Sequence, residues 1–454
     1  MADATQAPSP LIRSLDELRA PFEEAIKPVE AHRIGAEAEK FGVDAETGAP
    51  LHYEGPRGVL TVLQALAERY GWSPESEFPG GPIIALTRGK ASITLEPGGQ
   101  LELSGAPLET LHEIDQETED HLRELRSITD PMGIVWLGVG FHPFARQEDL
   151  SWVPKARYGI MQRFLPTRGK HGLDMMRRTA TVQANFDYES EEAALRKLRI
   201  GLKLAPLGTA LFANSPYYEG SIYGGCSYRA KAWLSVEPAR QGLVPAVLEG
   251  ARTFEAYIDW ALDAPMFLVK RGSQILEATH LSFREYLREG LGGERATMAD
   301  WVTHLNSMFP EVRLKRTLEI RGADSLPADL ATALPALWTG VFSDGRSLDE
   351  AEALCESFTF EELEALRPAV AQDGLRATFR GAPLVVLAEK LVDLAARGLV
   401  RRKRLDKDGC DELGYLAPIA RLVAKGQCPA DELLEASPRS GEALRRHILG
   451  FAQV

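Results

Sequence analysis

Hydrophobic and polar residues alternate in three segments of the chain, 34–43, 81–105 and 312–324. Successive side chains of a β-strand point to opposite faces, so this alternation predicts strands with one buried face. Glycine-rich turns divide segment 81–105 into short strands that return on one another. A continuous apolar run at 133–144 and a further alternating stretch at 178–188 predict two more strands.

Hydrophobic residues with a period of 3.6 predict helices between these strands and after the last of them. The predicted helical segments are 14–26, 58–71, 107–129, 157–164, 191–216, 253–263 and most of 347–452. Ser14, Ser347 and Thr359 are each followed three residues later by Glu, which is the spacing of an N-terminal capping box. Pro206 lies inside one of these segments and predicts a kink there.

The order of these elements predicts an α+β fold in one large domain. Strand patterns stop near residue 340, so we expect a single domain over 13–454 with a mostly helical C-terminal cap at 345–454. Residues 1–12 begin with a small, polar, Pro-containing stretch, and we expect them to be disordered. The sequence contains no internal repeat.

Composition narrows the classes of partner. The 454 residues are 44% hydrophobic and 26% charged, with a net charge of −13, which argues against nucleic acid or an anionic membrane as the main partner. No apolar stretch approaches the ~20 residues that span a bilayer, and the first residues do not resemble a secretory signal. The four cysteines contain no CxxC pair and fit reduced thiols in a cytoplasmic protein.

Carboxylates are the most informative candidate chemistry. Glu37 and Glu39 share one face of a predicted strand, and Glu96 and Glu102 flank a Pro-Gly-Gly turn. Segment 312–324 carries charges of both signs on one face, with Glu319 among basic residues that include Lys315 and Arg321. Such oxygen ligands suit Mg²⁺, and the basic residues suit phosphate. Solvent-exposed strand faces and cross-strand ion-pair ladders remain alternatives for each motif.

Other catalytic patterns are missing from the sequence: it contains no GxxxxGK[ST], GxGxxG after a strand, GxSxG or HExxH. Cys226 lies beside glycines in YGGCSYR. The sequence is compatible with either of two interpretations of this residue, a small buried thiol or a reactive thiol. Met175 and Met176 could line a soft pocket or fill the core.

Seven strings of the sequence resemble the plant-type family of glutamate–cysteine ligases, which also has bacterial members. They are RIGAEAEKFG, LEPGGQLELSGAPLETLH, YGIMQRFLP, GLDMMRRTATVQANFDY, ALFANSPYYEG, FEAYIDWALDAPM and FPEVRLKRTLEIRGAD. They occur in the family's order over roughly residues 30–425. The resemblance implies a curved antiparallel sheet of the glutamine synthetase and guanidino kinase type, wrapped by helices. It also implies that the domain predicted over 13–454 is catalytic.

The resemblance also implies an activity. The γ-carboxylate of L-glutamate would attack the γ-phosphorus of ATP, and the amine of L-cysteine would displace phosphate from γ-glutamyl phosphate in the first step of glutathione synthesis. Two or more Mg²⁺ ions and ATP would be required, in a monomer or weak homodimer. A ligase of the same fold that joins glutamate to another amine remains the alternative.

Residues are assigned by matching the family's motifs position by position. Metal ligands would be Glu37, Glu39, Glu96, Glu102 and Glu319. The catalytic cations would be Arg321, Arg229 and Lys315. Substrate-binding residues would be Met176, Arg178, Gln183, Asn185, Trp233, Tyr257 and Trp260.

The chain departs from the plant pattern at its cysteines. Asp115, Ala278 and Gly293 occupy the positions at which plant members carry regulatory cysteines. The pattern gives no reason to bring together any two of Cys226, Cys355, Cys410 and Cys428, and a pair among the last three is the least implausible. We therefore expect no thiol switch.

Overall fold

The computed structural model describes residues 9–272, 274–435 and 437–454. Its main element is a sheet of nine strands with only antiparallel neighbours among the described residues. Eight strands follow the order β14-β15-β7-β1-β5-β4-β3-β2, and β6 pairs with the C-terminal part of β1. The strands are β1 (Ile34–Asp44), β2 (Ser73–Glu75), β3 (Ala85–Arg88), β4 (Ala91–Leu95), β5 (Leu101–Ser104), β6 (Ile134–Leu137), β7 (Val182–Phe186), β14 (Val312–Leu314) and β15 (Leu318–Ile320).

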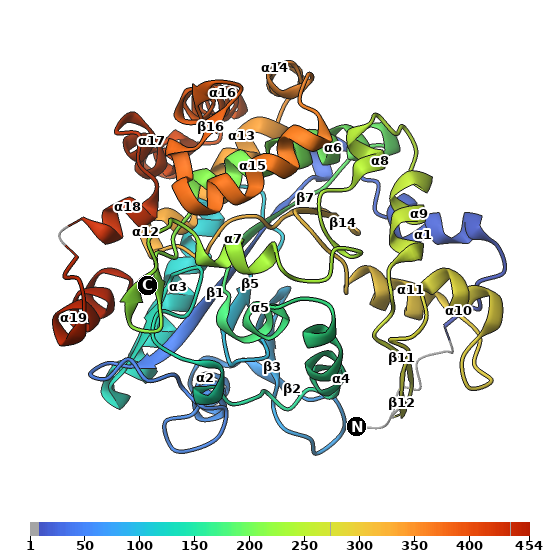
Figure 1. The fold of residues 1–454 in the computed structure, drawn as a ribbon, viewed down its shortest axis with the longest axis horizontal. Helices are drawn as coiled ribbons and strands as arrows, with labels where there is room; N and C mark the ends of the chain where they lie inside the picture. Colours follow the sequence, from blue (N-terminus) through green and yellow to red (C-terminus); the bar gives the residue numbers. More distant parts are fainter. Residues whose placement is uncertain (1–8, 273, 436) are drawn as a thin grey trace.

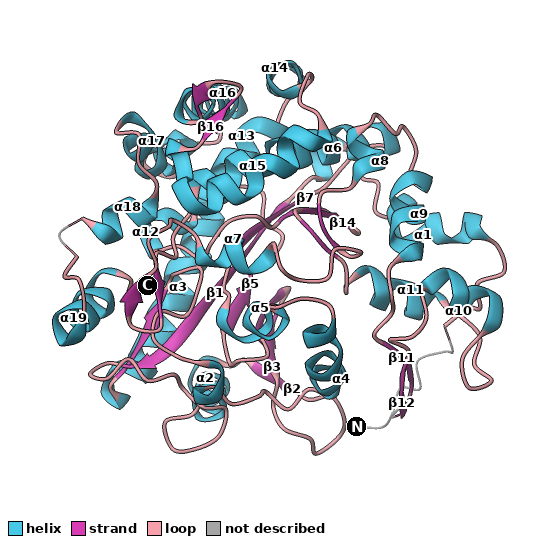
Figure 2. Ribbon diagram, in the orientation of Figure 1, coloured by secondary structure: helices cyan, strands magenta, loops and turns pink. Residues whose placement is uncertain are grey.

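Helices surround this sheet, which crosses the centre of the molecule (Figure 2). The helices of the C-terminal region gather on one side, at the top and left of Figure 1. The first eleven helices are α1 (Ala20–Glu23), α2 (Val59–Tyr70), α3 (Leu111–Thr129), α4 (Ala156–Phe164), α5 (Gly172–Arg178), α6 (Glu191–Leu211), α7 (Tyr228–Trp233), α8 (Pro245–Leu248), α9 (Glu255–Asp263), α10 (Phe283–Glu289) and α11 (Met298–Leu305). The others are α12 (Ala328–Ala331), α13 (Ala333–Phe342), α14 (Gly345–Cys355), α15 (Phe360–Asp373), α16 (Val385–Arg402), α17 (Ala417–Ala424), α18 (Pro429–Leu434) and α19 (Gly441–Phe451).

Within the part of the chain that the structure describes, four short strand pairs lie outside the main sheet. They are β8 (Tyr217–Tyr218) with β9 (Ser221–Ile222), β10 (Gln241–Gly242) with β13 (Phe309–Pro310), β11 (Leu268–Arg271) with β12 (Gln274–Glu277), and β16 (Thr378–Phe379) with β17 (Ala382–Pro383). The last pair lies between α15 and α16, within the C-terminal region that was predicted to be mostly helical.

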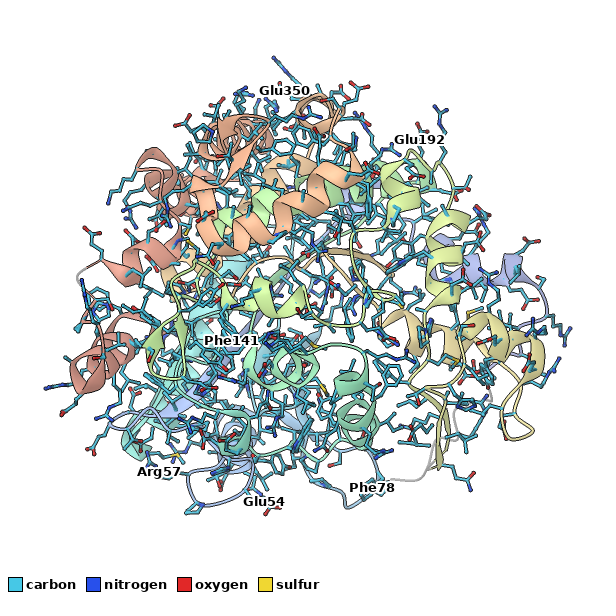
Figure 3. The ribbon with its side chains drawn as sticks, in the orientation of Figure 1. Glu54, Arg57, Phe78, Phe141, Glu192 and Glu350 are labelled. Carbon is cyan, nitrogen blue, oxygen red and sulfur yellow. The ribbon has the colours of Figure 1, made fainter. Side chains whose placement is uncertain are left out.

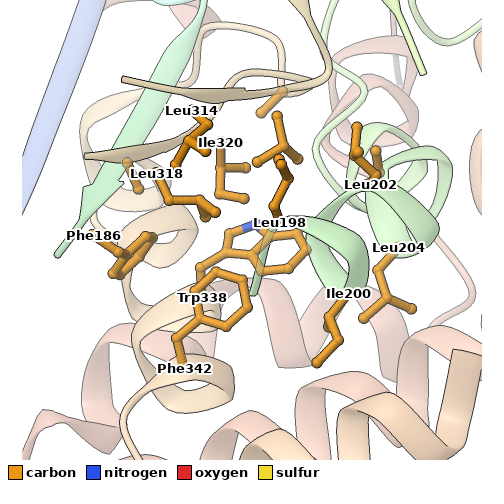
Figure 4. Close-up of a cluster of buried hydrophobic side chains, with 14 of the residues drawn as sticks. Phe186, Leu198, Ile200, Leu202, Leu204, Leu314, Leu318, Ile320, Trp338 and Phe342 are labelled. Atoms are coloured by element: carbon orange, nitrogen blue, oxygen red, sulfur yellow. The ribbon is translucent and has the colours of Figure 1, made fainter. Parts of the chain in front are cut away.

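One face of the main sheet is apolar and packs against α6 and α13. Phe186 of β7 and Leu318 and Ile320 of β15 are buried among side chains such as Leu198 and Trp338 (Figure 4). Burying a side chain of this size stabilises the fold by about 1.5–3 kcal/mol. Because the strand period is two, the polar residues of the same strands must share the opposite face. The predicted α+β fold, an antiparallel sheet wrapped by helices, is confirmed.

Two of the three predicted capping boxes are wrong. Residues Leu15–Arg19 form a 3₁₀ helix, Ser14 makes no side-chain cap, and α1 ends at Glu23 instead of passing residue 26. Lys27 precedes Pro28, which disfavours the helical conformation there. Asp344, not Ser347, caps α14, because its carboxylate accepts from the Ser347 amide at 2.9 Å. The box of Thr359 and Glu362 is present.

Two strand predictions also need correction. Segment 312–324 is a hairpin rather than one strand: the chain turns at Lys315–Thr317, and Arg313 of β14 lies directly opposite Glu319 of β15. The alternation survives because the turn keeps both residues on the same face. Segment 178–188 was predicted as one strand, but the strand β7 occupies only part of it. The first residue of the segment is the last residue of helix α5, which the alternating pattern did not predict.

We predicted disorder for residues 1–12, and residues 1–8 of this segment lie outside the described part of the chain. Residues 9–12 do not match the expected disorder. The Ile12 amide donates to the Ala296 carbonyl at 3.0 Å, and the Met298 amide donates to the Pro10 carbonyl at 3.0 Å. The single domain over 13–454 stays a prediction.

Two cysteines lie together although the sequence pattern indicated no such pair, and they are not a pair among Cys355, Cys410 and Cys428. Cys226, just before α7, and Cys428, just before α18, are both buried in one small cluster with Ala213 and Ala430. Neither the sequence spacing nor the helical pattern indicated this contact, because 201 residues separate the two thiols along the chain (428 − 226 − 1).

Helices α13 and α16 of the C-terminal region cross at two glycines. A Cβ atom on Gly340 would lie 2.2 Å from the Ala395 carbonyl oxygen. A Cβ atom on Gly398 would lie 1.9 Å from the Gly340 carbonyl oxygen and 2.7 Å from Ser347 Oγ. The closest contact of each is with backbone, so the helices can approach this closely only where neither residue has a side chain.

We therefore expect Gly398→Ala to lower the free energy of unfolding by about 2–3 kcal/mol, since the helices must separate. Urea unfolding measures this change. Gly450→Ala is the control: Gly450 also lies in a helix, a Cβ atom there would meet no neighbouring atom within 4 Å, and the change should be neutral or slightly stabilising. Equal stability of the two variants would contradict the close crossing.

Candidate active site

Three carboxylates meet on the polar face of the sheet. Glu39 of β1 lies directly opposite Glu102 of β5, and Glu96 follows the end of β4. Each offers an oxygen within 4.8 Å of the other two. Glu39 and Glu102 are only 9% and 7% exposed, so water screens their charges weakly. Like charges directly opposite in neighbouring strands destabilise a sheet, and this cluster therefore favours bound protons or a bound cation.

Hydrogen bonds fix the orientation of two members of this carboxylate cluster. The Thr181 amide donates to Glu39 Oε2 at 3.0 Å. The hydroxyls of Thr94 and Ser104 donate to the two oxygens of Glu102 at 2.9 and 2.6 Å. Burial, together with the charges of Glu96 and Glu102, raises the pKa of Glu39 well above its usual value.

Glu37 lies on the same face as Glu39, as the alternation predicted, and both line one cavity. Asn185 Nδ2 donates to Glu37 Oε1 at 2.7 Å. Burial and the charges of Glu319 and Glu102 raise the pKa of Glu37 to about 8. Glu37 thus connects the carboxylate cluster to the hairpin of β14 and β15.

Glu319 is surrounded by cations. Arg313 donates to its two oxygens at 2.6 and 3.0 Å, Lys315 Nζ at 2.9 Å and Arg321 at 2.9 Å. The Glu319 side chain is fully buried. Burial alone would raise its pKa, but the three cations outweigh burial and hold the pKa of Glu319 well below its usual value. Glu319 therefore lies in a different environment from Glu39, Glu96 and Glu102, and a metal-ligand role for it stays a prediction.

Two arginines extend this basic region. Arg321 also donates to Gln183 Oε1 at 2.7 Å. Arg229 of α7 donates to the Arg321 carbonyl at 2.9 Å and lies 4.0 Å from Asp324. Asp324 in turn accepts from Ser227 Oγ at 2.9 Å, which fixes the start of α7. The arginines are therefore positioned by neighbours that are themselves hydrogen-bonded.

A cavity of about 630 Å³ joins the carboxylate cluster to the basic region. Of the predicted site residues, those that line it are Glu37, Glu39, Glu96, Glu102, Met176, Gln183, Arg229, Trp233, Lys315, Glu319 and Arg321. Asn185 is not part of the lining but hydrogen-bonds Glu37. Pocket volumes of this size suit a nucleotide or other small substrates.

The Pro-Gly-Gly turn holds Glu96 and Glu102 at one end of this cavity. A Cβ atom on Gly98 would lie 2.4 Å from the Arg177 carbonyl oxygen, so only glycine allows the turn to approach α5 this closely. Gln100 donates to the Met176 and Thr179 carbonyls at 3.2 and 2.8 Å. Gln100, which the pattern placed in phase with Glu102, thus ties the turn to the end of α5.

Besides Asn185, three predicted substrate-binding residues lie outside the cavity lining: Arg178, Tyr257 and Trp260. Arg178 is buried against the ring of Phe141 and pairs with Asp174 and Glu219 at 3.1 and 3.2 Å. Phe141 lies within the molecule, away from rim residues such as Glu54 (Figure 3).

Tyr257 and Trp260 of α9 pack against one another in the hydrophobic core. The Leu314 amide donates to the Tyr257 hydroxyl at 3.1 Å. Tyr257 therefore supports the β14–β15 hairpin from behind. These contacts give no evidence of substrate contact for the two aromatic residues, so they do not support a pocket role for either.

Three cations that line the cavity were not among the predicted site residues. Lys155 and Arg157 enter it at the start of α4, and Arg313 enters from β14. The alternating pattern placed Arg313 on the face of Glu319, and that signal could have identified it as a site residue. Lys155 and Arg157 lie at the start of a helix with no alternation around them, so local sequence carried no comparable signal.

These residues fit a divalent cation and a phosphorylated substrate. Buried carboxylate oxygens with raised pKa values are a donor set for a hard cation such as Mg²⁺. Arginine and lysine on the same cavity wall suit phosphate and carboxylate oxygens. The fold and site together define a class of enzyme suited to phosphoryl transfer, in which positioning and electrostatics perform the catalysis.

Comparison with known proteins identifies the family. The sequence model described as glutamate–cysteine ligase family 2 matches residues 33–449. The chloroplastic glutamate–cysteine ligase B of Oryza sativa subsp. japonica is 42% identical over 95% of this chain and 85% of its own length. The chloroplastic enzyme of Medicago truncatula is 44% identical over 89% of this chain and 78% of its own. The chain belongs to glutamate–cysteine ligase family 2.

A solved structure shares the fold. The glutamate–cysteine ligase of Francisella tularensis, solved in complex with AMP, has a TM-score of 0.55 over 93% of this chain and 87% of its own. Its sequence identity is 16%, so the likeness concerns the fold alone. Among the residues that the structure describes, no helix is both long and apolar enough to cross a membrane.

The raised pKa of Glu37 predicts a pH-dependent effect on stability without divalent cations. Ionising Glu37 costs more free energy in the folded state, where its pKa is about 8, than in the unfolded chain, where it is about 4.5. The free energy of unfolding therefore falls as the pH rises from about 4.5 to 8. In a chelator, Glu37→Gln should raise the free energy of unfolding by about 2 kcal/mol at pH 8.5 and leave it nearly unchanged at pH 4.5. Urea titrations at the two pH values test this, with exposed Glu68→Gln as control. A gain that is equal at both pH values would contradict the assignment.

Glu319→Gln should have the opposite effect. Its depressed pKa means that ionised Glu319 stabilises the fold above the unfolded pKa, and that this contribution is lost as the pH falls. Removing its charge leaves buried cations unpaired, so we expect a loss of about 3 kcal/mol at pH 7 in urea unfolding. Glu24→Gln, which breaks an exposed pair with Arg316, should change stability by less than about 0.5 kcal/mol. If Glu319→Gln were as stable as the wild type, the charge of Glu319 would not be needed to stabilise the three buried cations.

Proposed function

We propose that this protein joins the γ-carboxylate of L-glutamate to the amine of L-cysteine with ATP, through γ-glutamyl phosphate. Membership of the family and the activity for which relatives at 42% and 44% identity are named support this reaction. The structural observation that carries the proposal is one cavity lined by both a carboxylate cluster and several arginine and lysine side chains. The product would enter glutathione synthesis as the first intermediate.

Mg²⁺ would be held by Glu39, Glu96 and Glu102, with Glu37 beside them. When bound, Mg²⁺ supplies positive charge that neutralises phosphoryl oxygens and aligns them for attack. Thr181, Thr94 and Ser104 keep the carboxylate oxygens turned toward the cavity by the hydrogen bonds described above. Such neighbours orient metal ligands in many sites.

The cations of the cavity would bind the oxygens of the two substrates. Arg321 and Lys315 would contact the transferring phosphoryl group, because both already present N–H donors beside a carboxylate in this cavity. Arg229 would bind a carboxylate of glutamate. No protein nucleophile is required, since the glutamate carboxylate attacks phosphorus and the cysteine amine attacks the acyl phosphate. The residues contribute position and charge.

The acceptor amine would lie near the apolar part of the lining. Met176 and Trp233 are the predicted pocket residues in contact with the cavity, and Phe309 packs against Trp233 with ring centroids 5.9 Å apart. A thioether and aromatic edges suit a small thiol side chain. The same surface also suits 2-aminobutyrate, so a ligase with a different acceptor amine remains the second candidate.

We further propose a cytoplasmic protein that acts as one catalytic domain, as a monomer or weak homodimer. The net charge of −13 and the reduced cysteines expected from the sequence support this setting. Neither nucleic acid nor a membrane is proposed as a partner.

The reaction is tested with ATP, Mg²⁺ and glutamate labelled with ¹⁸O in its γ-carboxylate. Phosphate release should require both glutamate and cysteine, and the released phosphate should contain ¹⁸O because the carboxylate oxygen becomes the bridge to phosphorus. Parallel reactions with 2-aminobutyrate and other amines rank the acceptors. Unlabelled phosphate would exclude an acyl phosphate, and a much faster rate with another amine would favour the second candidate.

Glu39→Gln should lower kcat at saturating Mg²⁺ by at least about 100-fold, because a metal ligand is lost. The same variant should be as stable as wild type or more stable without metal, since a repelling charge is gone. Glu68→Gln serves again as the exposed control. Near wild-type turnover of Glu39→Gln would remove Glu39 from the metal site.

A further inference from the structure

Cys226 and Cys428 form a buried dithiol between the C-terminal helical region and the segment that leads into α7. They are 1% and 0% exposed. Their sulfur atoms lie within 4.8 Å of one another and of an Asp431 oxygen. A disulfide needs a sulfur–sulfur distance of about 2.05 Å, so the sulfurs must approach by less than about 3 Å. Rotation about the two Cα–Cβ bonds can supply such a movement.

The backbone around the two thiols is held in register. The Cys226 amide donates to the Ala371 and Gln372 carbonyls at 3.2 and 3.1 Å. The Ala430 amide donates to the Ala213 carbonyl at 2.9 Å. Gly374 lies against both sulfurs, since a Cβ atom there would be 3.0 Å from the Cys428 sulfur and 3.1 Å from the Cys226 sulfur. The two cysteines are therefore kept together by the fold.

Charged neighbours give the two sulfurs different properties. Arg376 donates to Cys226 Sγ at 3.3 Å and also pairs with Asp431. Cys428 Sγ donates to Asp431 Oδ2 at 3.3 Å. Contact with Cys428 lowers the pKa of Cys226, and Arg376 acts in the same direction against burial. The same contact and burial raise the pKa of Cys428 well above its usual value.

The environment favours a thiolate at Cys226 with a protonated partner. A thiolate is the reactive form toward oxidants. The Arg376 side chain, which donates to the Cys226 sulfur, is itself 54% exposed. The Cys226 sulfur thus contacts a side chain that reaches solvent, and this side of the dithiol is the approach we assign to a small oxidant.

We propose that Cys226 and Cys428 form a reversible disulfide when the protein meets hydrogen peroxide. The Cys226 thiolate attacks one peroxide oxygen, the O–O bond breaks, and hydroxide leaves as water with a solvent proton, giving a sulfenic acid. Cys428 sulfur then attacks the Cys226 sulfur. The S–S bond forms as the S–O bond of the sulfenic acid breaks, and the departing hydroxide becomes water with the Cys428 proton, which Asp431 is placed to relay. Two thiols thus pass two electrons to one peroxide.

This bond would lie away from the positions at which plant relatives were expected to carry regulatory cysteines, which here are Asp115, Ala278 and Gly293. It would covalently connect the residues before α18 with those before α7, the helix that carries Arg229. Transient disulfides of this kind are compatible with a reducing compartment, because a thiol reductant restores the resting state.

The experiment uses the full chain with Cys410→Ser, which removes the exposed thiol and leaves three. Native protein is treated with hydrogen peroxide, and free thiols are then alkylated under denaturing conditions. We expect two of the three thiols to be lost, the mass to fall by two hydrogen atoms, and a cross-linked peptide pair to contain Cys226 and Cys428. Dithiothreitol should reverse these changes, and the oxidised protein should melt at a higher temperature than the reduced one.

Matched variants separate this site from other oxidation. Cys226→Ser and Cys428→Ser should each abolish the cross-link, whereas Cys355→Ser should retain it. Arg376→Gln should slow its formation several-fold, because the thiolate loses a cation. A cross-link that involves Cys355, irreversible oxidation of Cys226 without a cross-link, or stoichiometric Zn²⁺ held by both thiols would overturn the proposal.

Discussion

The opposition of Glu39 and Glu102 across neighbouring strands is the constraint on which the site depends. Two buried carboxylates in direct register repel one another, and Glu96 adds a third charge nearby. A sheet tolerates this pairing because its other face is packed by apolar side chains, which stabilises the strands independently of their polar face. Leu101 and Leu103 of β5 are buried among residues of α2 and α3, and β7 and β15 pack against α6 and α13. The cost on one face is offset on the other.

The cavity also has a basic region. Glu319 lies in it, where Arg313, Lys315 and Arg321 more than neutralise its charge. Glu37 lies between the two regions, and its raised pKa reflects both burial and carboxylate neighbours. Charge of both signs therefore lines one cavity: cations surround Glu319, and Lys155 and Arg157 lie near Glu96. Such an arrangement is suited to holding cations and anionic oxygens side by side.

The sequence alone predicted the parts of this arrangement that depend on the alternation of polar and apolar residues along a strand. Alternation placed Glu37 with Glu39 and Arg313 with Glu319 on common faces, and it did so even though segment 312–324 proved to be a hairpin. Family strings added Gln183 and Arg229, which no period would have brought to the cavity. The capping box at Ser347 failed because Asp344, three residues earlier, caps α14 instead. Ser14 makes no side-chain cap because a 3₁₀ helix follows it, and the helix does not pass residue 26 as predicted, since Pro28 disfavours its continuation.

Contacts between distant segments could not be predicted in the same way. Tyr257 matched a family string, yet its hydroxyl is used by the Leu314 amide in the core. Cys226 and Cys428 meet only because α18 and the segment before α7 dock on the same turn at Gly374. Local sequence records the residue types on each side of such a contact but not the contact itself. The chemistry of a thiol pair, like that of the carboxylate cluster, therefore arises from docking, because neither group is unusual until its partner is brought beside it.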